Sequence, residues 1–222
     1  MKKALLHSMV ILGVSWSIVG CGSGSSTYDS QVEDRTPSEL SQELKDSITF
    51  MYSEESLAHD IYLALNLVQP SNTFYNIATN SETKHIDAVN DLAVSYDLNM
   101  TQYPDTDVPY SINGIGNGTY IDPIKDLYNL LYAKGEDSLI HALEVGCIVE
   151  VVDVEDLDEA ISLAEQDNAS DVLDVFNFLR NGSYTHYWAF DKALITQGIV
   201  NGCCSVPDML GHNFCHPEYP KK

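Results

Sequence analysis

The segment Ser81-Glu82-Thr83-Lys84-His85 places a carboxylate and an imidazole in the middle of an amphipathic helix. This helix is predicted over about residues 72–97, and its apolar stripe consists of Phe74, Ile77, Ala78, Ala88, Val89, Leu92 and Tyr96. Glu82 and His85 fill the gap in the stripe, and residues three apart lie on one face of a helix. Both side chains are therefore expected inside the protein, where they could reach one metal ion or two adjacent ions.

Three other predicted helices interrupt their apolar stripes near mid-length in the same way. They cover about residues 36–67, 137–164 and 170–196. The residues that fill the gaps are, in chain order, Glu55, Glu150, Asp153, Ser183 and His186. Burying an unpaired carboxylate costs several kcal/mol or shifts its protonation. A shared divalent or trivalent cation would offset these costs, because it binds oxygen and nitrogen ligands together.

The pattern as a whole predicts an all-α protein in which four long helices form a bundle, within residues 36–198. A capping box at Thr36–Glu39 is expected to begin the first helix. A short extra helix is expected from Asp122 to about Lys134. Residues 98–121 show neither helical nor strand periodicity and would form the long crossover that some bundles require. Residues 199–222 are predicted to be an irregular, cysteine-containing tail.

The N-terminal residues have the features of a bacterial lipoprotein signal. Met1-Lys2-Lys3 is basic, residues 4–20 are apolar and uncharged, and small residues precede Cys21. We expect residues 1–20 to be removed and Cys21 to be acylated, which would anchor the exported protein to a membrane of the cell envelope. An uncleaved membrane helix is the alternative, but the apolar run is shorter than the ~20 residues that such a helix needs. Residues 21–35 would then be a flexible tether.

The charge is strongly negative, with 33 Asp plus Glu against 11 Lys plus Arg and a formal net charge of −22. A protein of this charge does not bind nucleic acid through its phosphates. An acidic surface attracts cations loosely and keeps a protein soluble, but it does not by itself make a metal site.

Four cysteines remain besides Cys21. In an oxidising compartment, a disulfide between Cys215 and either Cys203 or Cys204 is plausible. Whichever of Cys203 and Cys204 does not pair with Cys215 is then left without a role. Cys147 lies in a predicted helix and is interpreted as a small core residue.

Other polar residues near the gaps are predicted either to face solvent or to lie in or at the edge of the core. Glu54 is expected to face solvent. His59, one turn after Glu55, is interpreted as a core partner that supports the ligands, and Asp153 could equally bind a metal or hydrogen-bond at the edge of the core. The residues assigned to solvated helix faces are Asp60, Asp87, Asp91, Glu155, Asp156, Asp158 and Glu159.

Four motifs together resemble the ferritin-like family catalogued as domain of unknown function 2202, within the rubrerythrin-like group. In chain order they are Glu54-Glu55-x-Leu57-Ala58-His59-Asp60-x-Tyr62, Ser81-Glu82-x-x-His85-x-Asp87-Ala88-Val89, Val145-Gly146-x-x-x-Glu150 and Gly182-Ser183-x-x-His186-x-x-x-Phe190. The similarity spans about residues 48–196. It implies a ferritin-like four-helix bundle with a long crossover and one short extra helix.

The resemblance also implies a dinuclear iron site. The residues at the positions of the family's ligands are Glu55, Glu82, His85, Glu150 and His186. The sequence departs from the rubrerythrin-like pattern twice, because Ser183 and Cys147 stand where those proteins have glutamates, which leaves the second metal with fewer ligands. Asp153, one turn beyond Glu150, could substitute. His59, Tyr62 and Ser183 would support the ligands.

Three functions are compatible with this sequence. The first is a di-iron oxidoreductase of the ferroxidase or peroxidase type, acting on a small oxidant, in which Tyr62 or Tyr96 stabilises or relays charge. The second is a binding module for iron, manganese or zinc that has no turnover. The third is a metal-free helical interaction protein whose core carboxylates are protonated or paired with histidines.

Overall fold

The computed structural model describes residues 40–98, 122–209 and 211–221. Within these ranges every regular element is a helix, and no β-strand occurs. The prediction of an all-α bundle is confirmed. The predicted crossover lies almost entirely outside the described residues, and so do residues 1–35.

Helix α1 (Gln42–Val68) is capped by Ser41, whose side chain accepts a hydrogen bond from the backbone N–H of Leu44. The predicted start near Thr36 is therefore wrong, and the proposed capping box lies outside the described residues. A serine that accepts from the third residue after it satisfies one of the free N–H groups at a helix start. Ser41 also has a second role, because its backbone N–H donates to Asp167 at the far end of another helix.

The second long helix is interrupted at its centre. It begins as α2 (Asn72–Ile77), passes through one turn of π-helix, η2 (Ala78–Glu82), and continues as α3 (Thr83–Ser95). A π-turn is uncommon and occurs often at functional sites, because the extra residue in the turn changes the direction of nearby side chains. Glu82 is the last residue of this turn.

The remaining helices are α4 (Asp122–Gly135), α5 (Leu139–Asp167) and α6 (Ser170–Thr196), followed by the 3-10 turn η3 (Gly202–Ser205). Asn168 joins α5 to α6 in the left-handed conformation, with a φ of 51°. Such a tight connection makes α5 and α6 antiparallel neighbours.

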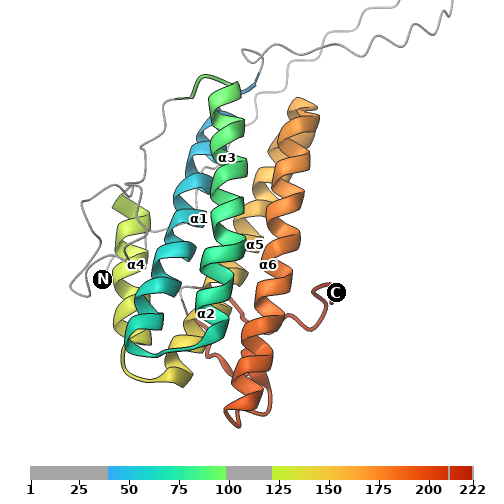
Figure 1. Ribbon diagram of the computed structural model, residues 1–222. Coiled ribbons are helices and arrows are strands. Elements are labelled where there is room, and N and C mark those ends of the chain that lie inside the picture. Colours follow the sequence, from blue (N-terminus) through green and yellow to red (C-terminus); the bar gives the residue numbers. More distant parts are fainter. Residues whose placement is uncertain (1–39, 99–121, 210, 222) are drawn as a thin grey trace, which may run out of the picture. The chain divides into compact units, whose positions relative to one another are not determined.

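The four long helices pack as a ring. Helix α1 contacts α3 and α5, and α6 contacts the same two helices, while α4 lies outside the ring against α1 and α5 (Figure 1). Every described residue belongs to one compact unit. Among the described helices, none combines the length and the hydropathy that a membrane-spanning helix requires.

The apolar core divides into two clusters along the helices. One contains Leu44, Ile48 and Met51 of α1 with Phe176 of α6, and the other contains residues such as Tyr62. The buried polar residues between them are Glu55, Glu82, His85, Glu150, Asp153, Ser183 and His186. Each long helix contributes to this layer, as the gaps in the apolar stripes predict.

Two disulfides hold the tail. Cys204 is bonded to Cys215, which is one of the two pairings left open by the sequence. Cys147 is bonded to Cys203, which joins the first half of α5 to η3. Cys147 is buried, but it is half of a disulfide and not a free core thiol, and this pairing accounts for the cysteine that the sequence left without a role.

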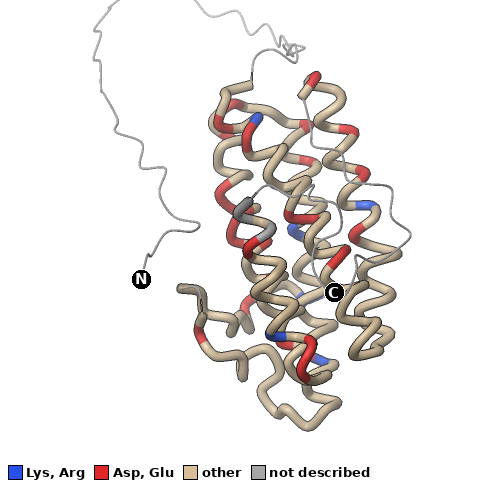
Figure 2. Tube along the Cα trace, turned by 90° about the vertical axis from the view of Figure 1, so that its left-hand side faces the viewer, with Lys and Arg blue, Asp and Glu red and all other residues tan. Residues whose placement is uncertain are grey.

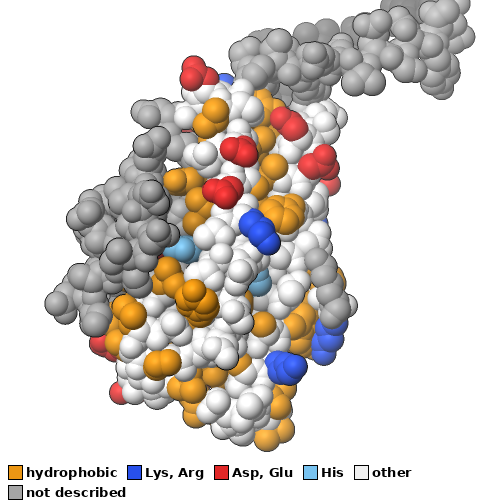
Figure 3. Space-filling view, viewed as in Figure 1, with side chains coloured by type: hydrophobic (Ala, Val, Ile, Leu, Met, Phe, Trp, Pro, Cys, Tyr) orange, Lys and Arg blue, Asp and Glu red, His pale blue; other side chains and the backbone are white. Residues whose placement is uncertain are grey.

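Asp and Glu residues are spread along the helices and far outnumber Lys and Arg (Figure 2). On the face in Figure 3 they gather toward the end where α3 finishes and α6 begins, and hydrophobic side chains are dispersed among polar ones. Scattered exposed apolar residues are normal on the surface of a folded protein.

Candidate metal centre

Five side chains from the four long helices meet between the two apolar clusters. Glu55 comes from α1, Glu82 from η2, His85 from α3, Glu150 from α5 and His186 from α6. None of them is more than 5% exposed. Within the described residues, Glu82, His85 and His186 have ligand atoms that all lie within 4.8 Å of one another, which makes them a candidate metal-ligand group.

Glu82 lies at the centre of this arrangement. Its Oε2 atom is 3.0 Å from His85 Nδ1, and its Oε1 atom is 3.1 Å from His186 Nδ1. Glu55 Oε2 approaches the same nitrogen of His85 at 3.0 Å, and Glu150 Oε2 approaches that of His186 at 3.3 Å. Each imidazole therefore faces two carboxylates, and Glu82 is the carboxylate that both imidazoles share.

These distances fit the edges of a coordination polyhedron. When ligand bonds are about 2.1 Å long and at right angles, neighbouring ligand atoms lie about 3 Å apart. Both oxygens of Glu82, Glu55 Oε1 and His186 Nδ1 have no hydrogen-bond partner among the described residues, although they are fully buried. Glu82 and His186 thus approach each other closely without hydrogen-bond geometry. Buried polar atoms without partners are costly, and a cation would satisfy them.

The π-turn supplies a partner that orients His186. Ser81, in this turn, places its Oγ atom 2.7 Å from His186 Nε2. If Nε2–H donates to this hydroxyl, the lone pair of Nδ1 is directed at Glu82 and Glu150. A hydrogen bond at the outer nitrogen of a ligating histidine fixes its tautomer and its ring orientation. Ser81 begins the motif that contains Glu82 and His85, but the sequence alone assigned it no role in the site.

The three residues predicted to support the ligands, Tyr62, His59 and Ser183, each contact a different carboxylate. The Tyr62 hydroxyl donates a short hydrogen bond to Glu150 Oε1. His59 Nδ1 pairs with the carboxylate of Asp60 at 2.8 Å. Ser183 Oγ lies 2.5 Å from Asp153 Oδ2 and also donates to the carbonyl of Leu179 at 3.0 Å.

Tyr96 does not belong to the site. Its hydroxyl donates to Asp171 Oδ2 at 2.6 Å, where α3 ends and α6 begins. Its proposed role as a relay for the core is therefore wrong, whereas Tyr62 is in contact with one of the five central residues.

Two assignments of acidic residues to solvent are wrong. Glu54 is 6% exposed and Asp60 is fully buried. The face of α1 that carries Glu54 is covered by α4 and α5, so that two consecutive glutamates, Glu54 and Glu55, are both internal. Burial is the largest cause that raises the pKa of Glu54. The nearby carboxyl group of Asp156, which is partly buried, raises this pKa further.

The charges in the layer stabilise one another only in part. Burial alone would raise the pKa of Glu82, but the imidazoles of His186 and His85 outweigh it and lower that pKa. Burial raises the pKa of Glu55 to about 7, against the opposing effect of His85. Burial lowers the pKa of His186, yet Glu82 and Glu150 together raise it to about 10. Without a metal, protons are thus held in the layer at neutral pH.

The metal-free protein is expected to lose stability as the pH rises from about 6.5 toward 10. The folded protein keeps the His186 proton up to a pKa of about 10, whereas the unfolded chain releases it near pH 6.5. Over this window the folded state binds more protons, so the free energy of unfolding falls by at most about 1.4 kcal/mol per pH unit for one proton. Glu55 acts in the same direction between about pH 4.5 and 7.

Urea unfolding across this range checks the effect. Adding metal should remove the decline, because a bound cation takes the place of the proton. A metal-free stability that stays level from about pH 6.5 to 9 would show that His186 carries no such proton.

Gly182 permits the position of His85. A Cβ atom added at Gly182 would lie 2.3 Å from both Cε1 and Nε2 of that ring. We expect Gly182→Ala to displace His85 and to weaken metal binding about 10- to 100-fold while the helix is retained, since alanine favours helix by about 1 kcal/mol over glycine. Metal titration of this variant is compared with Asn181→Ala, an exposed neighbour that should bind metal like the unmodified protein. Equal affinity of all three proteins would contradict the assignment of His85.

Comparison with known proteins identifies a family to which this chain is similar. A family model described as "Uncharacterized protein domain (DUF2202)" matches residues 44–206. The uncharacterized protein MJ0754 of Methanocaldococcus jannaschii is 32% identical over 160 residues, which cover 72% of this chain and 79% of that protein. The crystal structure of hypothetical protein MJ0754 matches with a TM-score of 0.62 and 32% identity, over 72% of this chain and 83% of that chain. None of these descriptions names an activity.

Proposed function

Because the chain belongs to the DUF2202 family, whose description assigns no activity, we propose its function from the site: it is a ferritin-like protein that binds one or two metal ions, iron foremost, in the core of its bundle. The observation that carries this proposal is the position of Glu82, whose two oxygens face two different histidines. A carboxylate in that position suits a bridge between two ions.

Two half-sites follow from the distances. One would consist of Glu55, His85 and Glu82 Oε2, and the other of Glu150, His186 and Glu82 Oε1. Each offers one nitrogen and two carboxylate groups. Mixed imidazole and carboxylate ligands suit iron, manganese and zinc, and iron is the metal that the resemblance to rubrerythrin-like proteins implies.

The two departures from the rubrerythrin-like pattern have different consequences. Cys147 is held in a disulfide with Cys203 and cannot replace a glutamate as a ligand. Ser183 contacts Asp153, whose Oδ1 atom is buried and without a hydrogen-bond partner among the described residues. Asp153 is therefore the available substitute for the carboxylate that α6 lacks.

A ferrous centre here would supply electrons for the reduction of dioxygen or peroxide. The chain's own contribution is to position the ligands and to exclude water, since the layer lies between two apolar clusters. Tyr62 holds Glu150 through its hydroxyl hydrogen bond, and burial together with the nearby carboxylates raises the pKa of Tyr62, so that the phenol stays a hydrogen-bond donor.

Elemental analysis of the purified protein, followed by oxygen and peroxide consumption with ferrous iron, tests the proposal. About two metal ions per chain with turnover would support an oxidoreductase. About one tightly bound ion without turnover would support a binding module, which the replacement of a glutamate by Ser183 favours. No bound metal after loading at neutral pH would leave the metal-free interaction protein and reject the proposal.

We also propose that the protein is anchored at the cell envelope through acylated Cys21. The support is the sequence pattern of residues 1–26, which lie outside the described structure. Cys21→Ser should abolish lipid labelling in a palmitate incorporation assay and release the protein from the membrane fraction. Labelling that persists in this variant would reject the anchor.

A further inference from the structure

The two histidines of the candidate metal centre lie beneath the seam between α3 and α6, which are neighbours in the ring of helices (Figure 1). Both direct Nδ1 toward carboxylates and the opposite side of the imidazole toward this seam. Cε1 and Nε2 of His85 face Gly182, and Nε2 of His186 lies 2.7 Å from the Ser81 hydroxyl. Gly182 and Ser81 are partly exposed, and His186 has the largest exposed fraction of the five central residues, 5%. The seam is therefore a side on which the described residues cover the centre thinly.

A phenylalanine covers His85 on the outer side of the seam. The ring of Phe178 lies 5.3 Å from that of His85, centroid to centroid, and the two planes are 81° apart. Phe178 is 46% exposed and His85 only 2%, so the phenyl ring has water on one side and the imidazole on the other. Phe178, Gly182 and His186 follow one another at intervals of four residues and share a face of α6. Because Gly182 has no side chain, the phenyl ring is the part of this face that shields His85.

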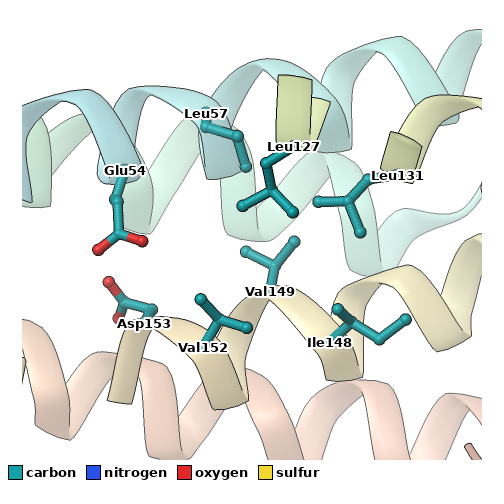
Figure 4. Close-up of a pocket in the computed structure, with 8 residues that line it drawn as sticks. All are labelled: Glu54, Leu57, Leu127, Leu131, Ile148, Val149, Val152 and Asp153. Atoms are coloured by element: carbon teal, nitrogen blue, oxygen red, sulfur yellow. The ribbon is translucent and has the colours of Figure 1, made fainter. Parts of the chain in front are cut away.

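The α1–α5 side of the ring, opposite the α3–α6 seam, is less suited to the passage of an ion. A small cavity lies there between α1, α4 and α5 (Figure 4). It has room for about one water molecule, and apart from the facing carboxyl groups of Glu54 and Asp153 its walls are leucine, isoleucine and valine side chains. An ion that crossed these walls would lose its water without gaining ligands, which is costly. The seam instead offers imidazole and hydroxyl groups, and the face of an aromatic ring attracts cations.

We propose that Phe178 is a gate for the centre: displacement of its ring from His85 opens the α3–α6 seam and lets a divalent metal ion pass between solvent and the carboxylates. The identity of what passes rests on the proposed function, whereas the shielding of His85 does not. A residue that acts only on the barrier changes the rates of entry and exit by the same factor and leaves the equilibrium affinity unchanged. A residue that merely holds a ligand in place changes the affinity instead.

Stopped-flow spectroscopy with Co²⁺, whose visible absorption reports its ligands, measures both rates. Phe178→Ala should speed the uptake of Co²⁺ by the metal-free protein and its removal by EDTA about 10-fold each, the factor that loss of one aromatic contact from the barrier produces, with an unchanged dissociation constant. Phe178→Tyr keeps the ring and should behave like the unmodified protein. Ile195→Ala shortens a similarly exposed apolar side chain of α6 and should change neither rate.

Modification of the metal-free protein by diethyl pyrocarbonate, followed by mass spectrometry, tests the shielding without metal. His85 should react about 10-fold faster in Phe178→Ala than in the unmodified protein and in Ile195→Ala. Equal reaction rates in all three proteins would overturn the gate. It is also overturned if Co²⁺ binds but Phe178→Ala leaves the uptake rate unchanged, or only weakens the affinity. Failure of every protein to bind Co²⁺ would instead refute the proposed function, and the gate with it, so the two failures are distinguishable.

Discussion

Glu82→Gln is expected to reduce metal affinity at least about 100-fold and to leave no more than one ion per chain. The amide keeps the size of the side chain but loses the charge, and one of its two ends becomes a donor that cannot bind a cation. Because each oxygen of Glu82 faces a different histidine, this single change affects both half-sites. No other residue of the layer is shared in this way.

Isothermal titration with Mn²⁺ or Fe²⁺ under anaerobic conditions measures the effect. Glu144→Gln is the matched control, because Glu144 is also on a long helix but pairs with Lys134 outside the layer. It should bind metal like the unmodified protein. If Glu82→Gln and Glu144→Gln bind equally well, Glu82 is not a ligand and the bridging arrangement is wrong.

Loss of the Cys147–Cys203 disulfide should destabilise the protein by about 4 kcal/mol. The two cysteines are 56 residues apart in the chain, so the bond restricts a long loop of the unfolded state. Both cysteines are fully buried, and their removal also disturbs the packing of η3 against α6. The Cys204–Cys215 bond spans only 11 residues, and its loss should cost about 3 kcal/mol.

Urea unfolding of Cys147→Ala/Cys203→Ala and of Cys204→Ala/Cys215→Ala compares the two bonds. Metal binding should survive in both double variants, because neither bond includes a ligand of the proposed centre. Unchanged stability in the first double variant would show that this bond does not hold the tail to α5. Loss of metal binding in the second alone would point to a role for the tail that the contacts do not indicate.

The bundle could be predicted because its helices are long and their apolar residues recur with the helical period. The gaps in those stripes also indicated that Glu55, Glu82, His85, Glu150 and His186 would be internal, and all five are buried in one layer. That they bind metal stays a prediction. The gap argument works because a buried charge in an apolar stripe is rare without compensation.

Other features depend on tertiary contacts that no local pattern encodes. Glu54 is buried because α4 returns after a long connection to pack against α1 and α5, whereas the stripe of α1 alone placed Glu54 toward solvent. The Cys147–Cys203 bond requires the tail to fold back on α5. The π-turn at Ala78–Glu82 has no sequence signature, so the contact of Ser81 with His186 could not be foreseen.

The central claim is that Glu82 joins two metal positions in the bundle core. Anomalous diffraction from crystals grown with Mn²⁺ tests it most directly. We predict two peaks, each about 2.0–2.3 Å from a different oxygen of Glu82 and from Nδ1 of His85 or His186. A core without an anomalous peak, in which Glu82 accepts hydrogen bonds from both protonated histidines, would contradict the claim.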